Sequence, residues 1–162
     1  MKTRLLIVIS IMALLIAGCS QTATDSYEKD PIAGFAWEII NRDIENLESN
    51  PAVKIIDSKI TRLELLETFD TLADNPIQVY ALEYRLLPED LSKVVMAGGM
   101  SYDEEGWLTE TASMGRPLLV ITHRGDEAEL MGIIWTGEVT GKGGMEKEIR
   151  DLLEQHNDMI RG

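Results

Sequence analysis

The period of the apolar residues changes twice along the chain, and this change restricts the fold more than any other feature of the sequence. Apolar residues recur at helical spacing from Asp30-Pro31 to Asn50-Pro51 and again from Met145 to about Ile160. Between these two segments, apolar and polar residues alternate as they do in half-buried strands. The pattern predicts one α+β domain over residues 30–162. In this domain a mainly antiparallel sheet of four to six strands packs against an N-terminal and a C-terminal helix, both on one face.

The regularity of the alternation differs between segments. Ile77 to Leu87 is the most secure strand, and the side chains expected on one of its faces are Tyr80, Leu82, Tyr84 and Leu86. The segment from Lys54 to Phe69 fits both a strand and a helix. Its β-branched residues favour the strand, because they pack well on a pleated surface.

Glycine and proline positions mark the expected turns. We expect one hairpin over residues 100–107, and another that joins residues 118–123 to 129–136 around Gly125-Asp126. A short helix is expected to start at Pro88 and to end at Gly98-Gly99, because proline suits the first helical turn and glycine suits the end. The stretch from Gly141 to Gly144 reads as a loop before the C-terminal helix.

The first nineteen residues predict export. Lys2 and Arg4 precede an apolar run that is too short to span a bilayer as a mature helix, which is typical of a secretory signal. The run ends in Leu15-Ile16-Ala17-Gly18-Cys19, and this ending resembles the lipobox of bacterial lipoproteins. The resemblance implies that diacylglycerol is attached to Cys19 through a thioether and that the chain is cleaved before it. An ordinary secretory signal with an incidental cysteine is the alternative.

Processing at Cys19 has physical consequences. Residues 1–18 are then the signal peptide, and the polar residues 19–29 form a lipidated tether. Two acyl chains hold a protein stably at a membrane. Loss of Lys2 and Arg4 takes the formal charge from -13 to -15. We therefore expect anchoring in the cell membrane or outer membrane, with the domain on the extracytoplasmic side; the sequence leaves open whether the envelope has one membrane or two.

The search for catalytic and metal-binding motifs gives mainly negatives. A single cysteine excludes an internal disulfide, and an excess of 28 acidic over 15 basic residues argues against nucleic-acid binding. We expect no metal and no cofactor. Ser113, His123 and Asp126 allow a hydrolase triad, and paired carboxylates are a second catalytic option, but the chain has no nucleophile-elbow or zinc motif. The acidic turn at Asp103 could hold calcium, and the glycine loop at Lys142 could hold phosphate; a solvated turn and a plain connection explain them better.

Four aromatic residues are candidates for a ligand groove, because aromatic side chains commonly line such sites. They are Tyr80, Tyr84, Trp107 and Trp135. The alternative is that they complete the core of a domain with few aromatic residues.

A second resemblance covers roughly residues 52–136. It rests on three strings: Tyr80-Ala81-Leu82-Glu83-Tyr84-Arg85-Leu86-Leu87-Pro88, then Ala97-Gly98-Gly99-Met100, then Asp103-Glu104-Glu105-Gly106-Trp107-Leu108. These strings resemble uncharacterised extracytoplasmic domains of Firmicutes, some of which are appended to membrane metallopeptidase antibiotic sensors. The resemblance implies a sensory or accessory module. It supplies no catalytic residue, because the metallopeptidase motif is absent from this chain.

These observations together predict a lipid-anchored envelope protein with a non-catalytic binding, sensory or accessory domain. Its partner is expected to be another envelope protein or a small ligand. A hydrolase that uses Ser113 or paired carboxylates is one alternative, and a passive envelope spacer is another.

Overall fold

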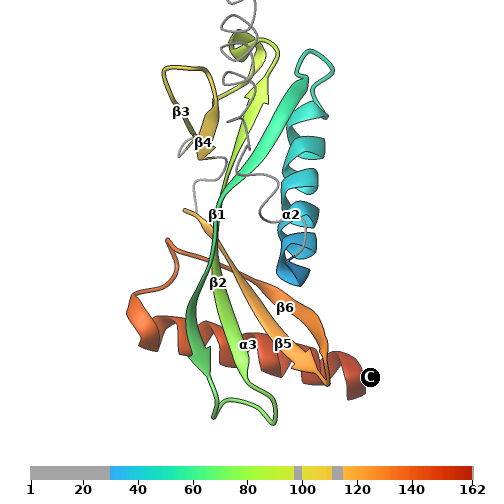
Figure 1. The fold of residues 1–162 in the computed structure, drawn as a ribbon, viewed down its shortest axis with the longest axis vertical. Helices are drawn as coiled ribbons and strands as arrows, with labels where there is room; N and C mark the ends of the chain where they lie inside the picture. Colours follow the sequence, from blue (N-terminus) through green and yellow to red (C-terminus); the bar gives the residue numbers. More distant parts are fainter. Residues whose placement is uncertain (1–29, 97–99, 111–114, 162) are drawn as a thin grey trace, which may run out of the picture.

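The computed structural model describes residues 30–96, 100–110 and 115–161. These residues form two α-helices, one short 3-10 helix and a six-stranded antiparallel sheet, which confirms the α+β class (Figure 1). Within those ranges, no helix combines the length and the apolar composition needed to cross a bilayer. In chain order the elements are α2 (Pro31–Glu48), β1 (Ile55–Phe69), β2 (Ile77–Pro88), the 3-10 helix η2 (Leu91–Lys93), β3 (Ser101–Tyr102), β4 (Leu108–Glu110), β5 (Pro117–Arg124), β6 (Glu127–Trp135) and α3 (Gly141–Arg161).

Strand β2 is the centre of the sheet. Strand β1 pairs with one edge of β2 along its length, and this pairing confirms that the ambiguous segment from Lys54 to Phe69 is a strand. The other edge of β2 is shared by two strands. Strand β5 pairs with Gln78–Ala81, whereas β4 pairs with Leu86. Both hairpins expected from the sequence, β3–β4 and β5–β6, are present.

The two helices pack on opposite faces of the sheet, so the expectation that both share one face is wrong. Leu82, Tyr84 and Leu86 of β2 share a hydrophobic core with residues of α2. Ile77, Val79 and Ala81 share a second core with Ile149 of α3. Because neighbouring residues on a strand point to opposite faces, the even-numbered and odd-numbered residues of β2 face different helices. Figure 1 shows α2 alongside the upper half of the sheet and α3 crossing its lower half.

Helix α2 begins where the sequence predicts. The carboxylate of Asp30 accepts a hydrogen bond from the backbone amide of Ile32 at 2.9 Å, and Pro31 occupies the first turn. This capping satisfies an amide that the helix itself leaves unpaired.

Two other expectations about helices are wrong. Residues Gly141–Gly144 are not a loop but the first turn of α3. Gly144 suits this place because a Cβ atom there would lie 3.3 Å from the backbone of Val139, so a larger residue would crowd the approaching chain. The helix expected from Pro88 is only the short η2, because Pro88 belongs to β2 and pairs with Ile55. Its expected end, Gly98-Gly99, lies outside the described residues.

Candidate functional site

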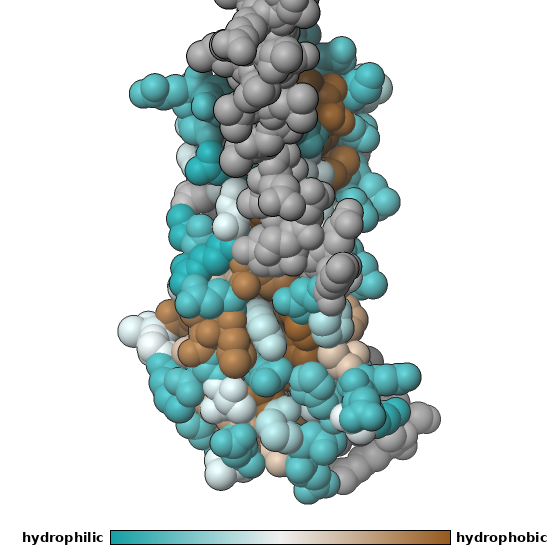
Figure 2. All heavy atoms as spheres, viewed as in Figure 1, coloured by the Kyte–Doolittle hydropathy of each residue, from teal (hydrophilic) through white to brown (hydrophobic). Residues whose placement is uncertain are grey.

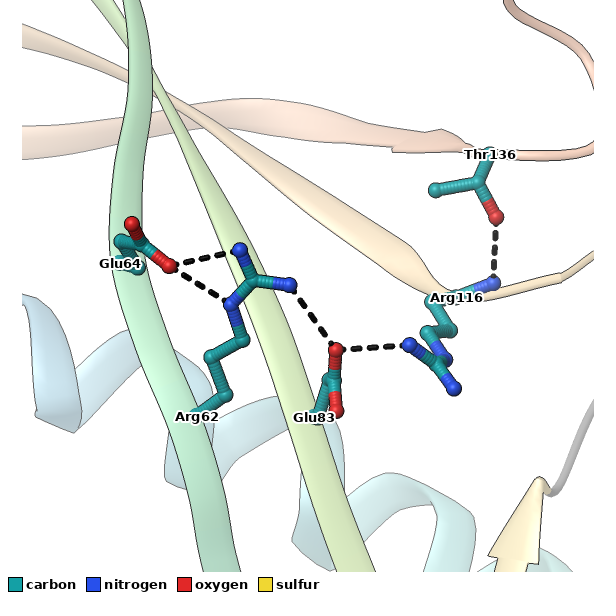
Figure 3. A network of polar contacts seen from close by, with 5 residues as sticks. All are labelled: Arg62, Glu64, Glu83, Arg116 and Thr136. Atoms are coloured by element: carbon teal, nitrogen blue, oxygen red, sulfur yellow. Dashed lines mark hydrogen bonds and ion pairs between the residues drawn. The ribbon is translucent and has the colours of Figure 1, made fainter.

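A network of ion pairs lies on the side of β1 and β2 that faces away from α2 (Figure 3). Arg62 of β1 contacts Glu64 at 2.6 Å and Glu83 of β2 at 3.1 Å. Arg116, just before β5, contacts the same oxygen of Glu83 at 2.7 Å. Glu83 therefore joins two guanidinium groups, one from β1 and one from the segment that leads into β5.

The position of this network follows from the strand register. Arg62 pairs with Glu83, and Lys59 pairs with Arg85. Ile60 and Tyr84 are buried against α2, so Lys59, Glu83 and Arg85 point to the other face. The register shift between Ile60 and Arg62 brings Arg62 to that face as well. Hydrogen bonds to Glu64 and then to Glu83 raise the pKa of Arg62 above its ordinary value. The guanidinium keeps its charge while remaining partly open to solvent.

The same face continues toward the β3–β4 hairpin. Arg85 contacts Asp103 at 2.8 Å, and the ammonium of Lys59 lies 3.8 Å from the ring centroid of Trp107. A cation over an indole ring is attracted by the ring quadrupole. We call this surface the arginine face, defined by Lys59, Arg62, Glu64, Glu83, Arg85, Asp103, Trp107 and Arg116.

Asp103 holds the turn of the hairpin as well as Arg85. Its second carboxylate oxygen accepts hydrogen bonds from the backbone amides of Glu105 and Trp107, both at 3.0 Å. Both of its oxygens therefore have protein partners. The acidic turn considered for calcium is built around this carboxylate, and its contacts give Asp103 a structural role.

Gly115 sets the position of Arg116. Its φ of +89° is unfavourable for other residues, and an added Cβ atom would lie 2.4 Å from the hydroxyl oxygen of Thr136. The amide of Arg116 donates to that hydroxyl at 2.8 Å, and the amide of Thr136 donates to the carbonyl of Arg116 at 3.0 Å. Figure 3 shows Thr136 next to the backbone of Arg116 while the guanidinium extends to Glu83.

The four aromatic residues considered for a groove do not share one surface. Tyr84 is buried, and its hydroxyl donates a hydrogen bond to Asp43 of α2. Tyr80 lies on the same side and donates to Gln78 at 3.2 Å; burial, and then the charge of Asp30, raise its pKa. Trp107 lies on the arginine face, and Trp135 pairs with Pro117 where the β5–β6 hairpin opens. Of the four, only Trp107 lies under the arginine face, and at 9% exposure it is a buried support for Lys59.

The residues of the hydrolase alternative are only partly described. His123 contacts Gln78 at 2.9 Å through its Nε2 atom, and Asp126 lies in the exposed β5–β6 turn. Ser113 lies outside the described residues, as do Cys19, the residues Leu15, Ile16, Ala17 and Gly18 before it, and the tether 19–29. In the part of the chain that the structure describes, no three His, Cys, Asp or Glu side chains are grouped as metal ligands.

Two hollows near these elements are small. A cavity of about 20 Å³ lies beside Glu83 and Arg116, and a hollow of about 170 Å³ lies between the end of α2 and Val95. Ligand pockets commonly measure roughly 300–1,000 Å³. Both volumes lie below that range. Figure 2 shows apolar atoms gathered near the middle of the viewed face.

No protein-family model matches this sequence. Searches of curated proteins and of solved structures also find no match. The arginine face is therefore assigned as the candidate site on its own geometry.

Proposed function

We propose that this chain is a lipid-anchored cell-envelope protein whose domain binds another envelope protein through the arginine face, in a sensory or accessory role. The anchor is the diacylglycerol that the lipobox pattern implies on Cys19. The observation that carries the binding role is the gathering of Arg62, Arg85 and Arg116 on one side of the sheet. The chain as a whole has 28 acidic and only 15 basic residues, and three of the basic residues meet on this face.

The chemistry of the arginine face suits a protein partner with exposed carboxylates. Arginine is one of the residue types enriched among residues that dominate binding energy at protein interfaces. Each guanidinium can hold a carboxylate through two parallel hydrogen bonds. The internal partners Glu64 and Glu83 satisfy these groups in the free protein. A partner carboxylate exchanges with Glu64, whose side chain is the more exposed of the two.

Photocrosslinking in intact cells tests the binding role. A photoreactive residue at Glu64 places the probe at the border of the arginine face, and one at Asp151 places it on α3 as a matched control. We expect one reproducible protein adduct from residue 64 and none from residue 151. The double variant Arg62→Ala/Arg116→Ala should lose the adduct and keep its melting temperature nearly unchanged.

Two outcomes contradict the proposal. Equal capture from both probe positions means that the adducts are collisional. No adduct from either position favours the passive spacer. Lipid attachment is checked separately, because Cys19→Ser should abolish labelling with a fatty-acid analogue and leave the chain uncleaved or released.

A further inference from the structure

The end of the sheet where α2 finishes and β1 begins carries exposed apolar side chains. Ile56 is 53% exposed, Val95 is 78% exposed and Met96 is 39% exposed. We call these three residues the apolar end. Exposed apolar side chains that gather at one end of a molecule are candidates for contact with a protein or a membrane.

The local structure brings these residues to one end of the molecule. Ile56 is the extra residue of a register shift between the pairs Ile55–Pro88 and Asp57–Leu87. Val95 borders the hollow that also contacts Leu47 and Val53. In Figure 1 the α2–β1 connection and η2 lie at the same end of the sheet.

Val95 is held outward by its well-packed neighbour. Val94 is only 7% exposed and belongs to the core under α2, and its amide donates to the carbonyl of Leu91 at 3.1 Å. The backbone at Val94 is extended, so successive side chains point in opposite directions. The side chain of Val95 therefore points into the solvent.

We propose that the apolar end rests on the neutral lipid bilayer that holds Cys19, with Ile56, Val95 and Met96 at the boundary between headgroups and acyl chains. This inference rests on the proposed lipidation of Cys19. Apolar side chains that enter this boundary add to the attachment that acyl chains provide. The contact fixes which way the arginine face points relative to the membrane.

The tether is long enough for this orientation. Helix α2 has 18 residues, so it extends about 27 Å from its start near Asp30 to the apolar end. Residues Cys19 to Lys29 number 11, and an extended chain of that length spans about 36–40 Å. Cys19 can therefore reach the plane of the apolar end from the start of α2.

The opposite end of the sheet suits water instead. The β1–β2 connection exposes Asp70, Thr71, Asp74 and Asn75. Placing these polar groups against acyl chains would cost free energy, because they would lose hydrogen bonds to water. This connection therefore lacks the exposed apolar side chains that Ile56, Val95 and Met96 present at the apolar end.

The charges around the apolar end select the type of lipid. Lys54 and Lys93 are outnumbered by four carboxylates, those of Glu48, Asp57, Glu89 and Asp90. Glu48 and Asp90 also accept backbone hydrogen bonds, from Ile55 at 2.8 Å and from Ser92 at 3.0 Å. An anionic surface repels this set of charges, so the contact depends on apolar insertion and weakens as the fraction of anionic lipid rises.

Fluorescence from single labelled thiols tests the inference on the full lipidated chain. Cys19 is the only cysteine, and the thioether consumes its thiol, so Val95→Cys introduces a unique label site. Asp74→Cys places the same dye at the opposite end as a matched control. In phosphatidylcholine vesicles that contain brominated lipid, we expect loss of fluorescence at residue 95 and none at residue 74. Increasing the phosphatidylglycerol fraction should restore the signal at residue 95.

The outcomes separate the inference from the proposed function. A lipidated chain whose dye at residue 95 stays in water, or whose two dyes are quenched equally, overturns the inference and leaves the anchor intact. The dye at residue 95 could also stay in water on vesicles while the same position crosslinks to a protein in cells. That result identifies a protein as the occupant and overturns the inference. A reactive Cys19 thiol in the unsubstituted chain overturns the anchor itself, and the inference with it.

Discussion

The two helices cover the sheet very differently. Helix α2 buries Ile32, Ala33, Ala36, Ile39 and Ile40 against the upper half of the sheet. In α3, Ile149 is the fully buried side chain among those described, and Leu152 and Leu153 are partly buried. Strand β2 contributes to both cores, through Leu82 on one face and Ala81 on the other. Strand β2 thus belongs to two hydrophobic cores that lie on opposite faces of the sheet.

The largest expected effect on stability comes from truncating one buried side chain in each core. Leu82→Ala removes a fully buried side chain under α2, and Ile149→Ala does the same under α3. Each should lower the free energy of unfolding by about 2–5 kcal/mol, because the cavity adds to the lost burial. Denaturant titration followed by circular dichroism measures both. Since β2 belongs to both cores, one transition is expected in each variant; a separate early transition in Ile149→Ala would show that the α3 layer unfolds on its own.

Two glycines with a positive φ allow a test whose expected effect on stability is intermediate. Gly115→Ala should cost about 1–3 kcal/mol, because it combines a positive φ with the close contact to Thr136. Gly125→Ala is the matched control, since Gly125 also has a positive φ but no neighbouring atom within 4 Å of the added Cβ. Thermal unfolding compares the two. Equal losses would mean that backbone strain alone explains Gly115 and that Thr136 adjusts freely.

The start of α2 gives the third test. Asp30→Ala removes the carboxylate that caps Ile32 and should cost about 0.5–2 kcal/mol in unfolding free energy. Asp30→Asn keeps a capping oxygen and should recover most of that loss. If both variants unfold like the parent chain, the buried face of α2 alone determines where the helix begins.

The smallest effect concerns the start of α3. Lys142 contacts Glu67 of β1 at 2.7 Å, and this hydrogen bond lowers the pKa of Glu67 below its ordinary value. The pair therefore stabilises the fold at pH values above the ordinary pKa of the carboxyl. That contribution is lost as the pH falls through the lowered pKa of the folded state. Lys142→Met should remove this part of the acid dependence, which the melting temperature measured at several acidic pH values checks.

The sequence predicts local features well where the signal is local. The Asp30-Pro31 pair places the start of α2, and the turn at Gly125-Asp126 places a hairpin. The even-numbered face of β2 is also predictable in its upper half. The burial of the odd-numbered side chains of β2 is not predicted, because alternation implies only one buried face. In the structure Ile77, Val79 and Ala81 are buried too. The nearly continuous burial along β2 is the pattern of a strand covered on both sides.

The arginine face could not be predicted in the same way. Arg62 and Glu83 are 21 residues apart in the sequence, and Glu83 and Arg116 are 33 apart. Their contact depends on the pairing register of β1 against β2, and this register shifts at three places. A shift of one residue would send each side chain to the other face. The turn glycine at Gly115, beside Pro117, is the one local signal that marks this region.

The adjacency of Ala81 and Leu82 has a mechanical consequence. Sliding β2 by one residue would take apolar side chains out of both layers at once, so its translation is opposed twice. Strand β2 therefore cannot change its register without exposing apolar side chains from both cores. The two cores together therefore fix the register of β2 against its neighbouring strands.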